Sequence, residues 1–421
     1  MQERDTHDGE SFIHVADLHL AIRSGSILKR DASTGRLEHD MDMDRAFVAS
    51  VDRTLKLSPL PSAYVIAGDI FDTYAGSPDA FVTVVREVRR LTDAGIAVIA
   101  IAGNHDTPTN ALKTPMFCML QSVFSDNDLV TLAYDGIERV TVGDIEYVLL
   151  PHKVCLDGGF DADDIRPSGD ASHSVLVVHG VAAGDPSLRQ MDEAKEIPIA
   201  KWILDLPWDY VAFGHYHKPG WIPGYTGKAA YSGSLENTVV SGPDVCMERG
   251  PALIDMRHAG TTDVSTQLRN PIRDIVRLHD ISLGELDESE MPSATDLDGM
   301  IEDAVSSNQR HDAIVLLSVT GVPRSTYRAL PRRNWQSCDP TALLVRVSFD
   351  FATERRVMDE AVVDDADDSD VQDNGQADDN ATIRPLAVEA EDAVNRLVSG
   401  GSISAKYKDR VIGKLRELLA E

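Results

Sequence analysis

Seven side chains able to bind a metal ion stand directly after short apolar runs of this sequence. The runs are rich in β-branched residues, which is typical of strands buried on both faces of a parallel sheet. Ligands of open α/β sheets gather beyond the carboxyl ends of the strands, so this placement predicts one shared site. The seven side chains are Asp17, His19, Asp69, Asn104, His179, His215 and His217.

The types and spacing of these side chains favour a divalent metal ion. Asp17 with His19, and His215 with His217, are two positions apart, so in an extended segment each pair points to one side. Carboxylate, amide and imidazole donors without a nearby cysteine suit manganese, iron or zinc. Seven ligands are too many for one open site and match two ions that share a carboxylate. Two such ions about 3.5–4 Å apart activate a water and stabilise an in-line displacement at phosphorus.

The order of the motifs distinguishes a metal site from the alternative that these are ordinary structural residues. A lone D-x-H, or one histidine after a strand, is most often an ordinary core or surface residue. Here G-D-x-x-D at 68–72 and G-N-H-D at 103–106 stand about thirty-five residues apart, and H-G and then G-H-x-H follow. This series predicts a metallophosphoesterase.

The motifs resemble those of the calcineurin-like metallophosphoesterase superfamily. Within it they are most similar to the SbcD family, the nuclease subunits of SbcC–SbcD DNA repair complexes. The similar segments are V-A-D-L-H-L, G-D-I-F-D, G-N-H-D-T-P, G-H-Y-H-K-P and Y-S-G-S-L-E, within roughly Ser11 to Glu236. One departure is Ala21, where the family commonly has a glycine, and it concerns the entry to the next loop and not the ligands.

The resemblance implies two divalent metal ions, with manganese as the metal. One ion would be held by Asp17, His19, Asp69 and His217. The second would be held by Asp69, Asn104, His179 and His215, so that Asp69 bridges the ions.

The resemblance also implies catalytic roles for two further residues. His105 matches the catalytic histidine of the family, which stabilises the transition state and protonates the leaving oxygen. Asp72 could accept a hydrogen bond from His105, which would orient the imidazole and favour its charged form. The alternative role for Asp72 is a cap at a turn or helix start.

Length and composition bound the class of protein. A chain of 421 residues exceeds one typical core, so two or three domains are expected. The four cysteines are scattered and form no C-x-x-C motif, which favours a reducing compartment. The first ten residues are polar, and no apolar stretch approaches the eighteen residues of a membrane span. We therefore expect a cytoplasmic protein without a membrane contact.

The formal net charge of −29 is unusual for an enzyme of DNA, because phosphate contacts generally need a basic surface. Part of this charge is local, since residues 359–383 contain ten acidic residues and no basic one. That composition predicts a disordered segment. Bound divalent ions add positive charge where a phosphate must lie, so the acidic total does not exclude a nucleic-acid substrate.

The apolar pattern predicts an α/β fold with a mixed sheet. The predicted elements are a polar loop over 21–44, a helix over 45–57, strands over 64–68 and 96–102, a helix that begins at Ser77-Pro78 and ends at Gly95, and a hairpin over 140–150. The strand–helix–strand order is that of a parallel βαβ unit. The family resemblance makes the fold a four-layered α/β/β/α sandwich.

We predict four parts along the chain. They are a metallophosphoesterase (nuclease) domain over 11–268, a capping domain over 269–355, an acidic disordered linker over 359–383 and a helical tail over 384–421. The capping domain would be a small α/β module with strands over 275–281, 313–319 and 343–349 and a helix over 297–305. In SbcD-like proteins this module helps to hold DNA over the site, and a plain accessory domain is the alternative.

The tail contains two short amphipathic helical patterns, the second of them around Leu415. They would either dock on their own domain or bind a partner. A tether of roughly twenty-five residues favours a partner, because a self-docking element seldom needs such reach. The resemblance implies that this partner is the coiled-coil base of an SbcC-like ATPase.

The sequence thus predicts a two-metal DNA exonuclease and endonuclease that acts on DNA ends or hairpins in repair, together with an SbcC-like ATPase. A homodimer is a further assembly to consider. One alternative is a phosphodiesterase or phosphatase of the same superfamily that acts on a small molecule or phosphoprotein. It would share every ligand but would need neither the cap nor the tail. A non-catalytic binding module is the other alternative, and it would be expected to have lost ligands.

Overall fold

The computed structural model describes most of the chain up to residue 352. The described residues are 7–22, 27, 29–110, 113–183, 198–239, 249–258, 261–265, 272–284, 286, 290–332 and 334–352. The acidic linker predicted over 359–383 and the helical tail predicted over 384–421 lie outside the described residues.

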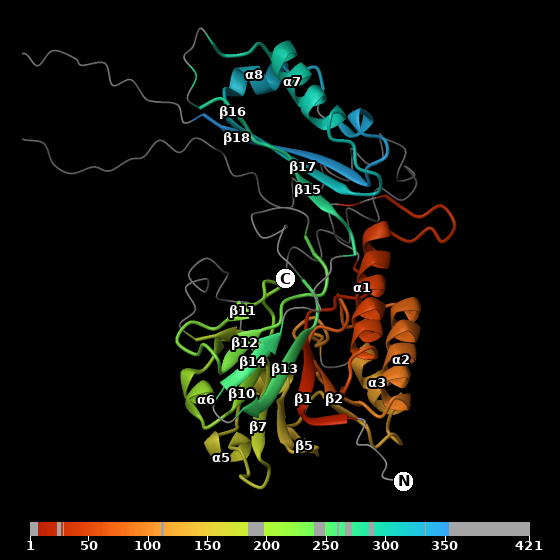
Figure 1. The fold of residues 1–421 in the computed structure, drawn as a ribbon, viewed down its shortest axis with the longest axis vertical. Helices are drawn as coiled ribbons and strands as arrows, with labels where there is room; N and C mark the ends of the chain where they lie inside the picture. Colours follow the sequence, from red (N-terminus) through yellow and green to blue (C-terminus); the bar gives the residue numbers. More distant parts are fainter. Residues whose placement is uncertain are drawn as a thin grey trace, which may run out of the picture. The chain divides into compact units, whose positions relative to one another are not determined.

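One six-stranded sheet has the order β14–β13–β1–β2–β3–β4. Figure 1 labels its strands β14, β13, β1 and β2. Its strands are β1 (His7–Val15), β2 (Leu60–Ala67), β3 (Ala97–Ile101), β4 (Val130–Ala133), β13 (Ala252–His258) and β14 (Thr261–Ser265). Strands β1 to β4 are parallel, and β13 and β14 add antiparallel strands at the β1 edge. Helix α2 (Pro78–Asp93) connects β2 to β3 and begins at the Ser77 cap, which confirms the predicted βαβ unit.

A second six-stranded sheet has the order β11–β12–β10–β7–β6–β5. Its strands are β5 (Glu138–Val142), β6 (Ile145–Leu150), β7 (His173–His179), β10 (Tyr210–Gly214), β11 (Gly220–Trp221) and β12 (Ala229–Tyr231). Strands β5 and β6 form the predicted antiparallel hairpin, while β6, β7, β10 and β12 run parallel. The short strands β8 (Val181–Ala182) and β9 (Pro198–Ile199) pair separately.

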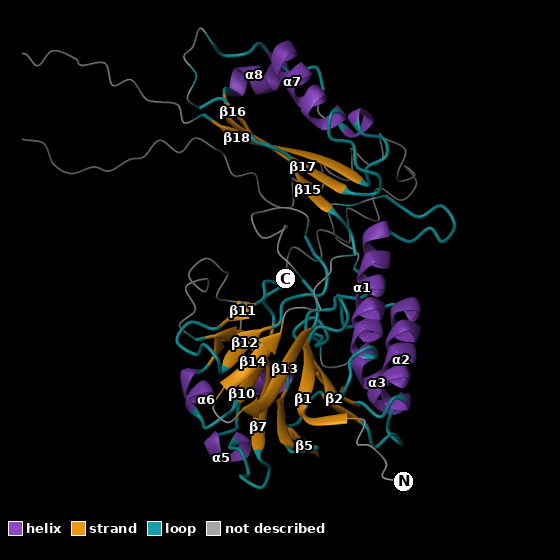
Figure 2. Ribbon diagram, viewed as in Figure 1, coloured by secondary structure: helices purple, strands orange, loops and turns teal. Residues whose placement is uncertain are grey.

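Alternating side chains of the first sheet divide the core between its two faces. Ile13 and Tyr64 pack against helices, whereas Phe12 and Val65 pack against the second sheet. The helices on the first sheet are α1 (Glu38–Thr54), α2 and α3 (Met116–Val123). The outer face of the second sheet packs on α4 (His152–Asp157), α5 (Ala162–Ile165) and α6 (Lys201–Asp205). The four-layered α/β/β/α sandwich is therefore confirmed (Figure 2).

Helix α1 begins at Glu38, about two turns before the predicted start at residue 45. Its first turns look like a polar loop in the sequence, but their charged side chains are paired. Arg36 binds the carboxylates of Asp40 and Asp44, each at 2.8 Å. Met43 in the same turns is buried. The prediction of a loop up to residue 44 was wrong because apolar periodicity does not register paired charges.

A third sheet forms a small α/β module. It contains β15 (Ile275–Arg277), β16 (Ile281–Ser282), β17 (Ile314–Val322) and β18 (Leu344–Phe351), with helices α7 (Ala294–Ser306) and α8 (Arg324–Ala329) and the 3-10 helix η3 (Gln336–Cys338). Strands β15, β16 and β18 all run parallel to β17. The strand predicted over 275–281 is two short strands separated by 278–280. The domain boundary predicted at 268/269 stays a prediction.

Two buried contacts connect this module to helix α1 and to the loop before it. Arg273, 4% exposed, binds Asp42 of α1 at 2.6 and 2.9 Å and also the carbonyl oxygen of Asp312. Ile27 packs among Ile314, Leu316 and Leu343. The segment that follows the first two predicted ligands is thus tied to the module by an ion pair and by apolar contact.

None of the helices in the described part of the chain has the length and apolar character needed to span a bilayer.

Candidate metal centre

All seven predicted ligands lie at the carboxyl ends of strands, and both large sheets contribute. Asp17 and His19 follow β1, Asp69 follows β2, Asn104 follows β3, His179 ends β7, and His215 and His217 follow β10. Three groups of donor atoms each lie within 4.8 Å of one another. These groups are Asp17 with His19 and His217, His19 with Asp69 and His105, and Asp17 with Asp69 and His179.

The carboxylate of Asp69 lies between two histidines. Its Oδ2 atom is 3.3 Å from Nε2 of His179 and 3.8 Å from Nε2 of His19. Asn104 extends the cluster, because its Oδ1 atom is 2.8 Å from Nε2 of His179 and 3.2 Å from Nδ1 of His215. The structure thus brings all the predicted ligands into one connected cluster.

Four of the ligands have a backbone in the left-handed region, which L-residues rarely adopt. The φ angles are 54° at Asp17, 44° at His19, 53° at Asp69 and 109° at His215. Such a conformation costs on the order of 1–3 kcal/mol per residue and persists only where the surrounding structure enforces it. Ala21 is left-handed too, with φ 67°, which is the geometry that a glycine would adopt without strain.

Two glycines let the cluster close. A Cβ atom at Gly103 would meet the Asp69 carboxylate, and one at Gly214 would meet the carbonyl oxygen of Ala67 and the ring of His179. The glycines that precede the ligands in G-N-H-D and G-H-Y-H are therefore required by close packing.

Electrostatics in the cluster favour added positive charge. Burial would lower the pKa of His179, but the Asp69 carboxylate beside it raises that pKa to about 9. Burial likewise opposes the charged form of Asp69, yet His179 and His19 hold the pKa of that carboxyl well below its usual range. Burial raises the pKa of Asp17. His179 therefore retains a proton where a divalent ion would supply the same charge and displace that proton.

The donor geometry fits metal ions. Nε2 of His19 and Nε2 of His217 face each other at 2.9 Å, where two ring nitrogens can share only one hydrogen. Nδ1 of His179 is 2.8 Å from the carbonyl oxygen of Ala67, so this nitrogen carries a hydrogen, and the neutral ring would offer the lone pair of Nε2 to a metal ion. Lone pairs that converge in this way, beside two buried carboxylates, are the environment of a divalent cation.

His105 lies beside the cluster and is exposed. Its ring centroid is 4.7 Å from that of His19. Its Nδ1 atom donates to the backbone carbonyl of Asp72 at 2.6 Å, so its Nε2 atom is directed elsewhere. The Asp72 carboxylate instead lies 3.4 Å from Nδ1 of His19. The expected hydrogen bond between His105 and Asp72 thus involves the main chain and not the side chain of Asp72.

Asp106 is a supporting residue that the sequence reasoning passed over. Its carboxylate, fully buried, accepts hydrogen bonds from the backbone N–H groups of Ile70, Phe71 and Gly103 at 3.0–3.1 Å. It thereby joins the loop after Asp69 to the loop before Asn104. Burial and the nearby Asp69 carboxylate raise the pKa of Asp106 to about 6. The signal was present, since Asp106 is the last residue of G-N-H-D.

Arg249 was also passed over. It is 5% exposed and donates to the carbonyl oxygen of His217, to Ser234 and to Asn237. Ser234 lies in the segment Y-S-G-S-L-E and Asn237 directly follows it. The backbone N–H of Ser234 also donates to the carbonyl oxygen of His217, so this segment supports the main chain of His217. No local pattern points to Arg249, which stands twelve residues beyond Asn237.

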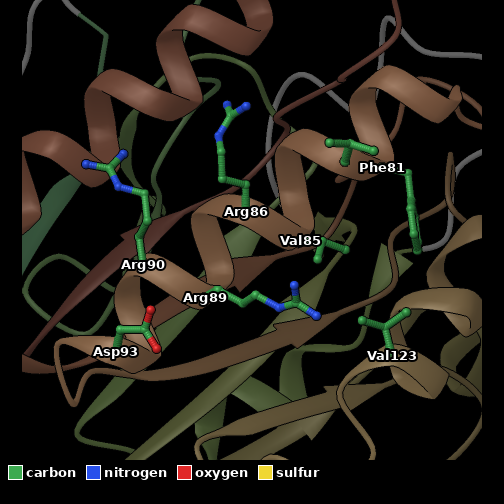
Figure 3. A pocket seen from close by; sticks show the side chains of 8 residues that line it. Phe81, Val85, Arg86, Arg89, Arg90, Asp93 and Val123 are labelled. Atoms are coloured by element: carbon green, nitrogen blue, oxygen red, sulfur yellow. The ribbon is translucent and has the colours of Figure 1, made fainter.

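A separate cavity of about 560 Å³ lies on helices α2 and α3 (Figure 3). It is lined by Phe81, Val82, Val85, Arg86, Arg89, Arg90, Asp93 and Val123. None of these lining residues is a predicted ligand, so the cavity is distinct from the cluster.

Comparison with known proteins gives one family and a set of relatives. The family model described as calcineurin-like phosphoesterase matches residues 11–219. Among the relatives are proteins named DNA double-strand break repair protein Mre11 from three organisms. The one from Saccharolobus solfataricus is 26% identical over 49% of this chain and 49% of its own length. The one from Aeropyrum pernix is 28% identical over 65% and 64%, and the one from Halobacterium salinarum is 26% identical over 97% and 94%. The chain thus spans about half to two thirds of the first two relatives.

We expect Asp106→Asn to loosen the cluster. The amide can offer only one oxygen to three N–H donors, and its NH₂ group would face one of them. The free energy of unfolding should fall by about 1–3 kcal/mol, the cost of leaving a buried polar group unsatisfied. Denaturant unfolding measures this, and mass spectrometry of the native protein measures metal content, which should also fall. The control is Asp126→Asn at an exposed aspartate. If both variants unfold and bind metal like the unaltered protein, the supporting role of Asp106 is wrong.

Proposed function

Because residues 11–219 belong to the calcineurin-like phosphoesterase family, as the motifs predicted, we propose that this protein is a metal-dependent phosphodiesterase that cleaves DNA. The proposal is carried by the convergence of the seven ligands, with the buried Asp69 among them and the exposed His105 beside them. The names of the relatives supply DNA as the substrate. The reaction proposed is exonuclease and endonuclease cleavage at DNA ends or hairpins in repair.

The proposed cofactor is a pair of divalent ions, with manganese as the metal. Asp17, His19, Asp69 and His217 would hold one ion, and Asp69, Asn104, His179 and His215 the other. The position of Asp69 Oδ2 between His19 and His179 supports its role as the bridge. Bound ions would neutralise phosphate charge and activate a water for attack at phosphorus.

His105 is the proposed general acid. Its Nδ1–H donates to the carbonyl oxygen of Asp72, which fixes the ring. When the imidazole is protonated, Nε2 holds the proton that passes to the leaving sugar oxygen. The exposure of His105 leaves this nitrogen accessible to a substrate that lies over the cluster. Asp72 would act as a positioning residue, through its carbonyl on His105 and its carboxylate on His19.

Basic side chains near the ligands in the sequence support an anionic substrate in this acidic chain. Lys29 and Arg30 are exposed on the loop after the first ligand pair, and Lys218 is exposed directly after His217. Lys113 is exposed eight residues beyond His105. Elsewhere the acidic surface would repel DNA, so binding would concentrate at the ends of the strands.

The proposed partner is an SbcC-like coiled-coil ATPase, bound through the helical tail over 384–421. The capping domain over 269–355 would help to hold DNA.

We also propose the cytoplasm as the compartment, since Cys118, Cys155 and Cys338 are free thiols.

A homodimer is proposed through the face formed by α2 and α3. Val82, Met119 and Val123 are 60%, 48% and 43% exposed there, which is unusual for large apolar side chains. Arginines of α2 line the cavity on the same face (Figure 3). Arg86 and Arg90 are paired with the carboxylates of Glu87 and Asp52, which reduces the like-charge repulsion in a two-fold contact where each copy offers the same patch.

Cleavage of linear duplex DNA and of a chromogenic phosphodiester, both with Mn²⁺, tests the function. We expect cleavage of DNA that Asp69→Asn abolishes, with metal content falling toward one ion or none, because the bridging carboxylate is lost. Cleavage of the small phosphodiester alone would favour a small-molecule phosphodiesterase instead. Full activity of Asp69→Asn with both ions retained would contradict the ligand assignment.

His105→Leu separates catalysis from metal binding. Metal content should stay unchanged, because Asn104 and not His105 is the proposed ligand. The rate of DNA cleavage at saturating Mn²⁺ should fall by about 10²–10⁴-fold, the contribution typical of a positioned general acid. Loss of metal from this variant would show that His105 is a ligand or a structural residue.

Light scattering and co-purification test the two assemblies. Val82→Glu places charges in the dimer patch and should give a monomer, whereas Trp202→Glu on α6, at another exposed apolar residue, should keep the dimer.

Leu415→Glu should abolish co-purification with an SbcC-like ATPase and leave both the dimer and Mn²⁺-dependent cleavage of single strands intact. A monomeric unaltered protein, or ATPase binding by Leu415→Glu, would refute the respective assembly.

A further inference from the structure

The Nδ1 atom of His217 has a hydroxyl group as its partner, whereas Nδ1 of His179 and Nδ1 of His105 each have a backbone carbonyl oxygen. Nδ1 of His217 is 2.5 Å from the hydroxyl oxygen of Thr238, a residue that is 8% exposed. Its Nε2 atom faces Nε2 of His19 at 2.9 Å. The ring therefore has one nitrogen at the cluster and the other at a hydroxyl group.

Two neighbouring histidines show which ring nitrogen carries the hydrogen. Nδ1 of His179 and Nδ1 of His105 both lie within hydrogen-bond distance of backbone carbonyl oxygens, at 2.8 and 2.6 Å. A carbonyl oxygen only accepts, so both rings carry hydrogen on Nδ1, and in the ligand His179 this leaves Nε2 to the cluster. A hydroxyl group can either donate or accept, and only acceptance from Nδ1–H would give His217 the same tautomer.

We propose that Thr238 is a positioning residue for the metal ligand His217, whose Nδ1–H its hydroxyl accepts so that the Nε2 lone pair is directed at the metal. This inference rests on the proposed metal site. Such a second partner fixes both the tautomer and the ring orientation of a ligating histidine, and its loss commonly weakens metal affinity by 10–100-fold.

The main chain around Thr238 is itself fixed by distant contacts. The carbonyl oxygen of Thr238 is 3.3 Å from Nε2 of His39, which is 3% exposed in the first turn of α1. The same end of α1 carries Asp42, the buried partner of Arg273. Arg249 donates a hydrogen bond to the carbonyl oxygen of His217. The hydroxyl of Thr238 thus stands on a rigid support, as a positioning group requires.

Thr238→Val and Thr238→Ser test the proposal on the full chain. Valine keeps the shape of threonine and removes the hydroxyl, whereas serine keeps the hydroxyl. Mn²⁺ affinity, measured by competition with a chelator and without substrate, should weaken by about 10–100-fold in Thr238→Val and return to within a few-fold of the unaltered protein in Thr238→Ser. Thr54→Val is the control, because the Thr54 hydroxyl is buried and bonded within α1, away from the cluster. Its Mn²⁺ affinity should be unchanged.

A second measurement determines the tautomer of His217 in the unaltered protein, and a variant is used only to assign the signal. In the metal-free, histidine-labelled protein, nitrogen NMR of the His217 ring, assigned by its absence from His217→Gln, should show hydrogen on Nδ1. Hydrogen on Nε2, an unchanged affinity in Thr238→Val, or an affinity in Thr238→Ser as weak as in Thr238→Val would overturn the proposal. An unaltered chain that binds no Mn²⁺ would contradict the metal site itself, whereas these other outcomes contradict only the role of Thr238.

Discussion

The carboxylate of Asp69 is a buried anion, and a charge of that kind stays in a protein interior only where positive charge or hydrogen-bond donors lie beside it. His179 and His19 approach one of its oxygens, and the backbone N–H of His105 donates to the other at 2.9 Å. These partners come from strands of both large sheets. The two sheets pack through an apolar core and also meet at this one carboxylate, whose charge a pair of divalent ions would compensate most fully.

The close approach of these groups has a conformational cost that the rest of the domain must offset. Left-handed backbone at Asp17, His19 and Asp69 is unfavourable for L-residues. The structure offsets the cost with hydrogen bonds that the loops make across the sheet. The backbone N–H of His215 donates to both oxygens of Asp17, and Asp106 joins the adjacent loops. The ligands are thus preorganised, so that little reorganisation is left for the moment of metal binding.

Charge is also used to connect the parts of this acidic chain. The ion pair between Asp42 and Arg273 is almost completely buried, and removal of either partner would leave an unpaired charge in the interior. It fixes the end of α1 that carries His39. His39 contacts the carbonyl oxygen of Thr238, and the hydroxyl of Thr238 in turn contacts the predicted ligand His217. A continuous series of contacts, from Arg273 through Asp42, helix α1 and Thr238, thus connects the small module to His217. The relative from Halobacterium salinarum matches along 97% of the chain, so its similarity includes the residues of this module.

The sequence by itself determined the class of fold, the seven candidate ligands and the helix cap at Ser77, because each depends on residues that lie close together along the chain. The strand periodicity, the glycines directly before Asp69, Asn104 and His215, and the motif order needed no distant contact. Tertiary structure alone decided which atoms meet. The Asp72 carboxylate faces His19 and not His105, helix α1 begins at Glu38 through paired charges, and Thr238 and Arg249 support His217. Each of these outcomes depends on hydrogen bonds or ion pairs whose energy appears only when the chain is folded, so no local pattern could record them.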